Sequence, residues 1–305
     1  MFEAIVFQWE REFGNHFTSQ EQLFKFIPCH GNMTPFKTLL LIGLVTALIF
    51  TSCIHKSYYQ SPVQGNIPSF HAIPLASDSL KSAVYVTATL SLGGMNERLR
   101  DNVISFQGGL HRSHAIDHFR MYYGASLAVG NYNVKRYDYY YYDTYYADTI
   151  SINKNAGGKL FGAYGGYGGI SAAARMGRRG EWRYIGIEGN LFNEFGDYYT
   201  FRKSLPDSAA TTIDKKKYLG SLGISTELIF KGRSQNKFGM KFAFGSYLRS
   251  LPYNNGRSSN PYNTQDNLLY FSNTYHFTVQ KTTTYVQLNF ATHAANVQFG
   301  FNYRL

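Results

Sequence analysis

The amino-acid sequence predicts an all-β protein, a closed antiparallel up-and-down β-barrel of about ten strands that crosses a membrane. From Ala83 to Leu305 apolar and polar residues alternate with a period of two, which is typical of strands with two different faces. Most of these segments reach the roughly 9 to 11 residues that a tilted strand needs to cross a bilayer, whereas globular strands average about 5 to 6. Long polar connections alternate with short ones along the same region.

The composition agrees with a folded chain that has unusually many rings. Of 305 residues, 44% are hydrophobic and 17% aromatic, which excludes a disordered chain, and 8 prolines exclude a collagen. The formal charge is +11, but the basic residues form no long run, so we expect no nucleic-acid partner. Two cysteines cannot form a disulfide framework for a chain of this length.

The first 32 residues do not resemble a domain or a signal. They carry four acidic residues, Glu3, Glu10, Glu12 and Glu21, and are too few to bury a core of their own. We interpret residues 1–32 as an extension produced by a mis-set start, with Met33 as the start of translation.

Residues 33–52 read as an export signal. The apolar run Leu39–Phe50 would form a helix of about 18 Å, too short for a bilayer core of about 30 Å. Lys37 precedes it and small residues follow, the order typical of a signal peptide. The string LIFTSC resembles the bacterial lipoprotein signal, with Phe50 where that family usually has Leu, Val or Ile. The resemblance implies that Cys53 is the lipid attachment site, and an ordinary signal peptide is the alternative.

Residues 53–82 are rich in Ser, Pro and Gly, and we expect them to form a mostly extended periplasmic linker between the lipid and the barrel. Cys53 is followed by Ile54 rather than by Asp, which retains lipoproteins at the inner membrane in the best-known systems. The resemblance therefore implies an N-terminal lipid anchor on the periplasmic side of the outer membrane.

Residues 83–305 form the predicted barrel. In the last strand Val297, Phe299 and Phe301 share one face, while Gln298 and Asn302 share the other. Closure of the barrel is expected because an open sheet would leave unpaired backbone groups that lipid cannot satisfy. Ten strands are expected, at residues 83–93, 103–113, 119–130, 158–173, 182–196, 218–230, 237–249, 268–280, 283–291 and 295–305.

This pattern resembles the small outer-membrane barrels of Gram-negative bacteria. The long connections 131–157, 197–217 and 250–267 lie on one side, as the outer loops of that class do, and both ends of the barrel then face the periplasm. Richness in Tyr, Gly and Asn resembles the barrels of Bacteroidota. The final string FGFNYRL resembles the C-terminal strand signal of outer-membrane barrels, with Leu305 in place of the usual Phe. A soluble β-sandwich lipoprotein that binds a ligand is the alternative.

The search for chemistry gives no convincing catalytic constellation. His111 and Ser113 resemble the His-x-Ser pair of outer-membrane lipid hydrolases, but the expected topology places them at the periplasmic end. Asp117 and His118 resemble the acid and His content of barrel proteases, without the further acids. The glycine string 157–169 opens no helix and is expected to be a strand whose glycines are covered by neighbouring rings. We expect no enzyme, no cofactor and no metal site; a barrel hydrolase acting on lipid or peptide is the alternative.

Two features remain for function. Inward positions carry both charge signs, for which we expect stabilising pairs in a narrow lumen filled by side chains, with a selective channel as the alternative. The inward charged residues are Arg120, Glu188, Glu227, Lys241, Arg249 and Arg304. The first long loop carries Asp138, Asp143 and a cluster of tyrosines, which could contact a protein or glycan or stack as an extended hairpin. The candidate binding residues are Tyr139, Tyr140, Tyr141, Tyr142, Tyr145 and Tyr146. The partners implied by the resemblance are outer-membrane lipid, the barrel-insertion and lipoprotein-sorting machinery, and an extracellular protein or glycan at the loops. The role expected is structural, adhesive or binding.

Overall fold

A computed structural model describes residues 58–66, 70–96, 99–136, 155–177, 179–206, 210, 212–232, 234, 236–252 and 265–305. The chain divides into two compact units, Met1–Cys53 and Ile54–Leu305, and the described residues all belong to the second. The predicted start extension, the signal, Cys53 and the tyrosine cluster Tyr139–Tyr146 lie outside the described residues.

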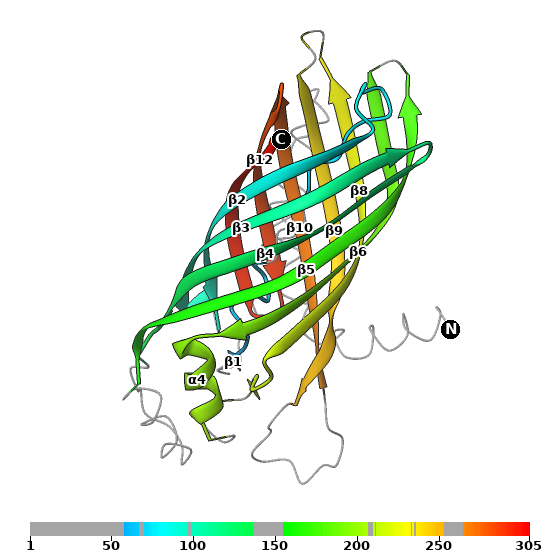
Figure 1. The fold of residues 1–305 in the computed structure, drawn as a ribbon. Coiled ribbons are helices and arrows are strands. Elements are labelled where there is room, and N and C mark those ends of the chain that lie inside the picture. The colour runs from blue at the N-terminus through cyan, green and yellow to red at the C-terminus, as the bar shows by residue number, and fades with distance from the viewer. Residues whose placement is uncertain are drawn as a thin grey trace, which may run out of the picture. The chain divides into compact units, whose positions relative to one another are not determined.

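Ten antiparallel strands close into a barrel, as predicted (Figure 1). Each observed strand overlaps the expected one, and most extend beyond it by a few residues. The strands are β2 (Ser82–Met95), β3 (Asp101–Ile116), β4 (Phe119–Val134), β5 (Gly157–Met176), β6 (Gly180–Phe195), β8 (Tyr218–Lys231), β9 (Lys237–Pro252), β10 (Gln265–Val279), β11 (Thr282–Ala291) and β12 (Ala294–Arg304).

The barrel closes between its first and last strands. β12 pairs with β2 from Ala294 opposite Met95 to Arg304 opposite Tyr85, and every other strand pairs with its sequence neighbours in the barrel. No edge strand remains in the barrel, so its backbone groups are paired within the wall. Closure of this kind is what a sheet needs in order to sit in lipid.

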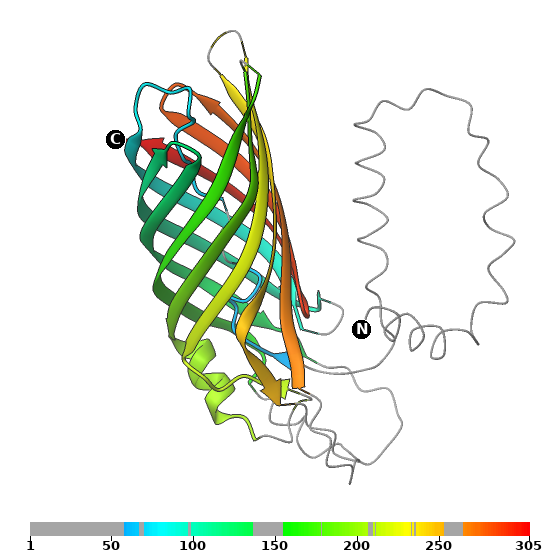
Figure 2. The same cartoon turned by 90° about the vertical axis from the view of Figure 1, so that its right-hand side faces the viewer.

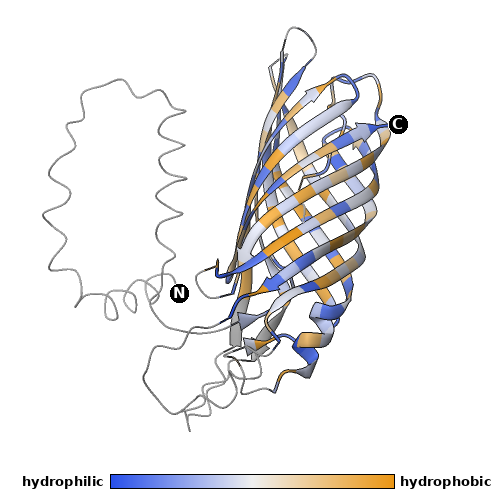
Figure 3. Cartoon of the chain, turned by 90° about the vertical axis from the view of Figure 1, so that its left-hand side faces the viewer, coloured by the Kyte–Doolittle hydropathy of each residue, from blue (hydrophilic) through white to orange (hydrophobic). Residues whose placement is uncertain are grey.

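The two faces of the wall have opposite character. Outward side chains are apolar and exposed, for example Phe106 at 54% and Phe299 at 48%, whereas inward Gln298 and Asn302 are at 0%. Hydrophobic and hydrophilic residues follow one another along the strands (Figure 3). This is the reverse of a soluble protein and is the pattern of a barrel surrounded by lipid. The alternative of a soluble β-sandwich, whose layers meet through those apolar residues, is wrong.

The two ends of the barrel differ, and we name them by their connections. At the short-turn end lie the turns 117–118, 177–179, 232–236 and 280–281, together with the end of β12. At the long-loop end lie the connections 96–100, 135–156, 196–217, 253–264 and 292–293. The connection 196–217 contains α4 (Asp197–Ser204) and β7 (Thr212–Ile213). Among the described residues no helix is long and apolar enough to span a membrane.

Glycines in the wall lie under aromatic rings, as expected for the glycine string. A side chain at Gly169 would meet the ring of Tyr122 on the neighbouring strand. A side chain at Gly300 would likewise meet the ring of Tyr285. The missing Cβ atoms make room for inward rings, which fill the lumen near the curved wall.

The chain ahead of the barrel differs from the predicted linker. β1 (Tyr58–Tyr59) pairs in parallel with β7, next to the long-loop end, and the residues that follow lie inside the barrel. An extended linker outside the barrel does not describe residues 58–66 and 70–75. The physical reason is that the narrow polar lumen is filled by backbone and side chains of this segment as well as by the side chains of the wall.

Candidate functional site

The lumen is occupied by residues 58–66 and 70–75, here called the luminal segment (Figure 2). All of residues 58–66 are buried, and so are Phe70, His71, Ala72 and Leu75. Backbone N–H and C=O groups that are shielded from water need hydrogen-bond partners. The hydrogen bonds of this segment therefore show whether it is a fixed part of the structure. They fall into three groups along the barrel.

At the long-loop end the segment is held by loop and wall residues together. The amide of Tyr58 donates to Asn96 Oδ1 at 2.7 Å, and the amide of Asp214 donates to the carbonyl of Tyr59 at 2.8 Å. Ser61 donates to the carboxylate of Glu194, which also pairs with Arg202 on α4. The start of the segment is therefore tied both to the barrel and to the long connection 196–217.

In the middle of the barrel, polar side chains of the wall bind the segment's backbone. The amide of Gly65 donates to the Tyr247 hydroxyl at 2.7 Å, and Gln298 Nε2 donates to the carbonyl of Asn66 at 2.9 Å. Ser91 Oγ donates to the Asn66 side chain at 2.5 Å. Gly65 has φ +95°, a left-handed conformation that glycine adopts without strain, and it lies close to β12.

At the short-turn end the segment contacts rings and charges. The carbonyl of Ala72 lies 3.0 Å from His111 Nε2, and the carbonyl of Ile73 accepts from Arg183 Nη2 at 3.1 Å. The ring of Phe70 stacks on His276 with 4.4 Å between centroids. The segment is thus held by inward side chains at its start, in its middle and at its end, and it is a built part of the lumen.

At the short-turn end, inward side chains of the wall form a connected series of ion pairs, here called the chain of charges. The Glu181 carboxylate accepts hydrogen bonds from Arg120 Nε at 3.0 Å, from Arg120 Nη2 at 2.8 Å and from Arg183 Nε at 3.2 Å. Arg183 Nη1 also forms an ion pair with Glu227 Oε2 at 2.5 Å, and Glu227 Oε1 lies 2.9 Å from His276 Nε2. Glu181 also accepts the amide of Ala76, directly after the luminal segment, at 2.8 Å, and Arg183 binds the carbonyl of Ile73 within it, so the chain of charges holds the end of the segment.

A second pair, Lys241 and Glu188 at 2.6 Å, lies deeper in the lumen. Together these contacts confirm the predicted pairing of inward charges for Arg120, Glu188, Glu227 and Lys241. The Arg249 side chain lies outside the described part of the structure, and Arg304 lies at the short-turn end.

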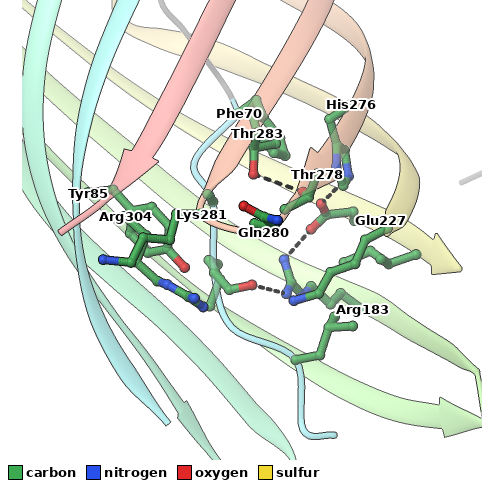
Figure 4. A pocket seen from close by; sticks show the side chains of 15 residues that line it. Phe70, Tyr85, Arg183, Glu227, His276, Thr278, Gln280, Lys281, Thr283 and Arg304 are labelled. Atoms are coloured by element: carbon green, nitrogen blue, oxygen red, sulfur yellow. Dashed lines mark hydrogen bonds and ion pairs between the residues drawn. The ribbon is translucent and has the colours of Figure 1, made fainter. Parts of the chain in front are cut away.

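Beside the chain of charges, at the short-turn end, is a small cavity (Figure 4). It has a volume of about 30 Å³, room for one or two waters. Phe70 and Ile73 of the luminal segment line it, together with Arg183, Glu227 and Arg304 of the wall. Asp78 lies nearby in the turn ahead of β2: burial opposes its ionisation, but Lys237 and Lys231 outweigh burial and lower the pKa of Asp78. Among the described residues no cluster of His, Cys, Asp or Glu could hold a metal ion.

Of the four residues considered for catalysis, His111 and Ser113 lie inside this filled lumen, whereas Asp117 and His118 are exposed. His111 and Ser113 are inward on β3 with exposures of 1% and 0%, near the short-turn end. His111 faces the carbonyl of Ala72, and Ser113 Oγ lies 3.5 Å from the carbonyl of Ala83. Asp117 and His118 form the turn between β3 and β4. The structure therefore surrounds His111 with the luminal segment and the wall.

The luminal segment is the feature that the sequence interpretation missed. No Asp, Glu, Lys or Arg occurs between Lys56 and Asp78, and His71 is the one basic residue there, which is unusual for a solvated linker. That uncharged stretch with Tyr58, Tyr59 and Phe70 was the available signal. Both ends of the barrel lie together at the short-turn end, as expected, since Arg304 pairs with Tyr85, whereas Tyr58 ahead of the barrel lies at the long-loop end.

No protein-family model and no curated protein matches the chain. Solved structures with similar folds include an outer membrane channel from Pseudomonas putida F1, with 9% identity, 77% of this chain and 100% of that chain covered, and a TM-score of 0.39. Neisserial surface protein A has 9% identity, covers 73% of this chain and 97% of its own, with a TM-score of 0.31. Ail of Yersinia pestis, solved with a heparin analogue, is 9% identical; the match covers 74% of this chain and 98% of Ail, with a TM-score of 0.26. The closed barrel with its apolar outer face and polar interior has the architecture of an outer-membrane β-barrel.

Proposed function

We propose that this chain is a non-enzymatic, lipid-tethered barrel of a Gram-negative outer membrane, closed by its own luminal segment. It acts from its long-loop end in envelope structure, adhesion or the binding of an extracellular protein or glycan. The observation that supports this most directly is the filled lumen, because a transport channel needs a continuous water path and a barrel hydrolase needs a site open to its substrate.

The long-loop end has a firm base for such a role. Tyr132 on β4 stacks on Tyr198 of α4 with 3.8 Å between ring centroids and 16° between planes. Tyr59 of the luminal segment and Phe201 of α4 belong to the same buried cluster. β4 and β5 run into the connection that carries the tyrosines Tyr139–Tyr146, so that loop starts and ends on a rigid platform.

The experiment is ion conductance across planar bilayers. We expect the purified full-length protein to give no steady conductance, and a variant lacking residues 58–75 to conduct, because the buried backbone and side chains of the luminal segment occupy space in the lumen that water then enters. Heat-dependent migration on gels checks that each barrel has folded. For a deletion variant that does not fold, the pair Tyr59→Ala and Phe70→Ala serves instead, with intermittent conductance expected. Steady conductance of the full-length protein equal to that of the variant would contradict the proposal.

A further inference from the structure

The luminal segment has a direction, and that direction fixes where the preceding chain leaves the barrel. Tyr58 and Tyr59 lie beside Asn96 and Asp214 at the long-loop end, whereas Ala76 contacts Glu181 at the short-turn end. The chain then turns at residues 76–81 and enters β2. Between these points the segment contacts wall residues on many strands of a closed barrel, so it passes through the lumen.

We infer that the chain threads its own barrel, so that the chain ahead of Tyr58 emerges at the outer surface while the end of β12 faces the periplasm. This inference rests on the proposed function for its orientation, in which long loops face outward and short turns face the periplasm. The threading itself rests only on the contacts of residues 58–66 and 70–75. It reverses the expected side of the lipid anchor.

Chain length limits where an acyl group could be held. Cleavage ahead of Cys53 leaves five residues, 53–57, before Tyr58, which span at most about 18 Å when fully extended. The bilayer core is about 30 Å thick. From the long-loop end these residues cannot reach the inner leaflet, and the closed wall separates them from the periplasm. An acyl chain on Cys53 therefore inserts into the outer leaflet.

Threading also explains why β1 pairs with β7. A strand that leaves a barrel mouth carries unpaired backbone groups, and the parallel pairing of Tyr58 with Thr212 and Tyr59 with Ile213 satisfies part of them. β7 belongs to the same connection as α4, whose Arg202 contacts Glu194 and Asp214. Residues of the long connection 196–217 thus bind the luminal segment at the point where it leaves the barrel.

The test uses full-length protein in intact cells, with a recognition site for a sequence-specific protease at one of three positions. The first lies between Ser57 and Tyr58, the second between Asn254 and Asn255 in a long loop, and the third after Gly232 in a short turn. We expect the first two sites to be cut on intact cells and the third only after the outer membrane is permeabilised. Protection of the first site until permeabilisation, while the second is cut, would overturn threading.

The loop and turn sites separate this inference from the proposed function. Cleavage of the turn site on intact cells, with the loop site protected, would overturn the orientation and the outer-surface placement together. The acyl group is followed by metabolic labelling with palmitate. We expect the labelled barrel to lose its label when the first site is cut on intact cells, and the Cys53→Ala variant to carry none. Label that stays on the barrel after that cut, or an unlabelled parent protein, would overturn the acyl assignment.

Discussion

Inside the barrel, a charged side chain is stable only beside groups that replace its water. Arg120 and Arg183 are both buried, and both depend on the carboxylate of Glu181. Removal of one partner from such a group leaves the remaining charges in a poorly solvated site, which costs more than the pair itself contributed. The cost falls on the wall and on the anchoring of the luminal segment, since Glu181 also accepts the amide of Ala76, the residue directly after that segment.

The Glu181→Ala variant is therefore expected to lower the free energy of unfolding by roughly 3 to 5 kcal/mol. Urea unfolding of the detergent-refolded barrel, followed by the heat-dependent shift on gels, measures this. The control is Lys217→Gln, which removes an exposed charge and should change stability by less than about 0.5 kcal/mol. Equal stability of Glu181→Ala and the control would show that the chain of charges does not support the fold.

The glycines of the wall give a matched pair of substitutions. A Cβ at Gly300 meets the ring of Tyr285, whereas a Cβ at Gly108 has no heavy atom within 4 Å. Gly300→Ala is expected to destabilise the barrel by about 1 to 3 kcal/mol through overpacking, and Gly108→Ala to be nearly neutral. The same unfolding assay compares them, and a larger loss in Gly108→Ala would contradict the account of ring-covered glycines.

Among the elements, the ten strands were predictable and the pieces at the long-loop end were not. Alternation with a period of two is a local property, since a strand between lipid and a polar lumen repeats its faces every second residue. Val297 and Gln298 show the pattern that located β12. α4, β1 and β7 depend on contacts between distant parts of the chain, such as Tyr132 with Tyr198, which no local pattern contains.

The docking of α4 is tested by Tyr198→Ala. Tyr198 stacks on Tyr132, lies 5.2 Å from the Arg202 guanidinium and donates to the carbonyl of Gln60 at 3.3 Å. Loss of the ring should free α4, so that trypsin cuts after Lys203 at least tenfold faster, while the barrel keeps its heat-dependent shift. The neighbouring Tyr199→Ala is the control, because Tyr199 is only half-buried. Unchanged cleavage in Tyr198→Ala would show that α4 does not depend on this ring.

For the whole molecule, the candidate site was only partly predictable. The inward positions of Glu188, Glu227 and Lys241 follow from strand alternation, and pairing follows from the cost of burying charge. The luminal segment was taken for a linker because its Pro, Ser and Gly content is typical of extended chain in water. The same composition also suits a chain whose backbone groups are hydrogen-bonded by a polar lumen. In the sequence, only the absence of Asp, Glu, Lys and Arg between Lys56 and Asp78 distinguishes such a segment from a linker in water.

The threaded lumen is tested most directly by a cysteine pair at Asn66 and Ser91, whose side chains are hydrogen-bonded at 2.5 Å. The matched control pairs Asn66 with Leu92, the next residue of β2, which points outward with 42% exposure. After mild oxidation of folded protein in the Cys29→Ala/Cys53→Ala background, thiols are counted in denaturant. The account predicts that Asn66→Cys/Ser91→Cys loses both thiols while Asn66→Cys/Leu92→Cys keeps them. Two free thiols in both variants would contradict it.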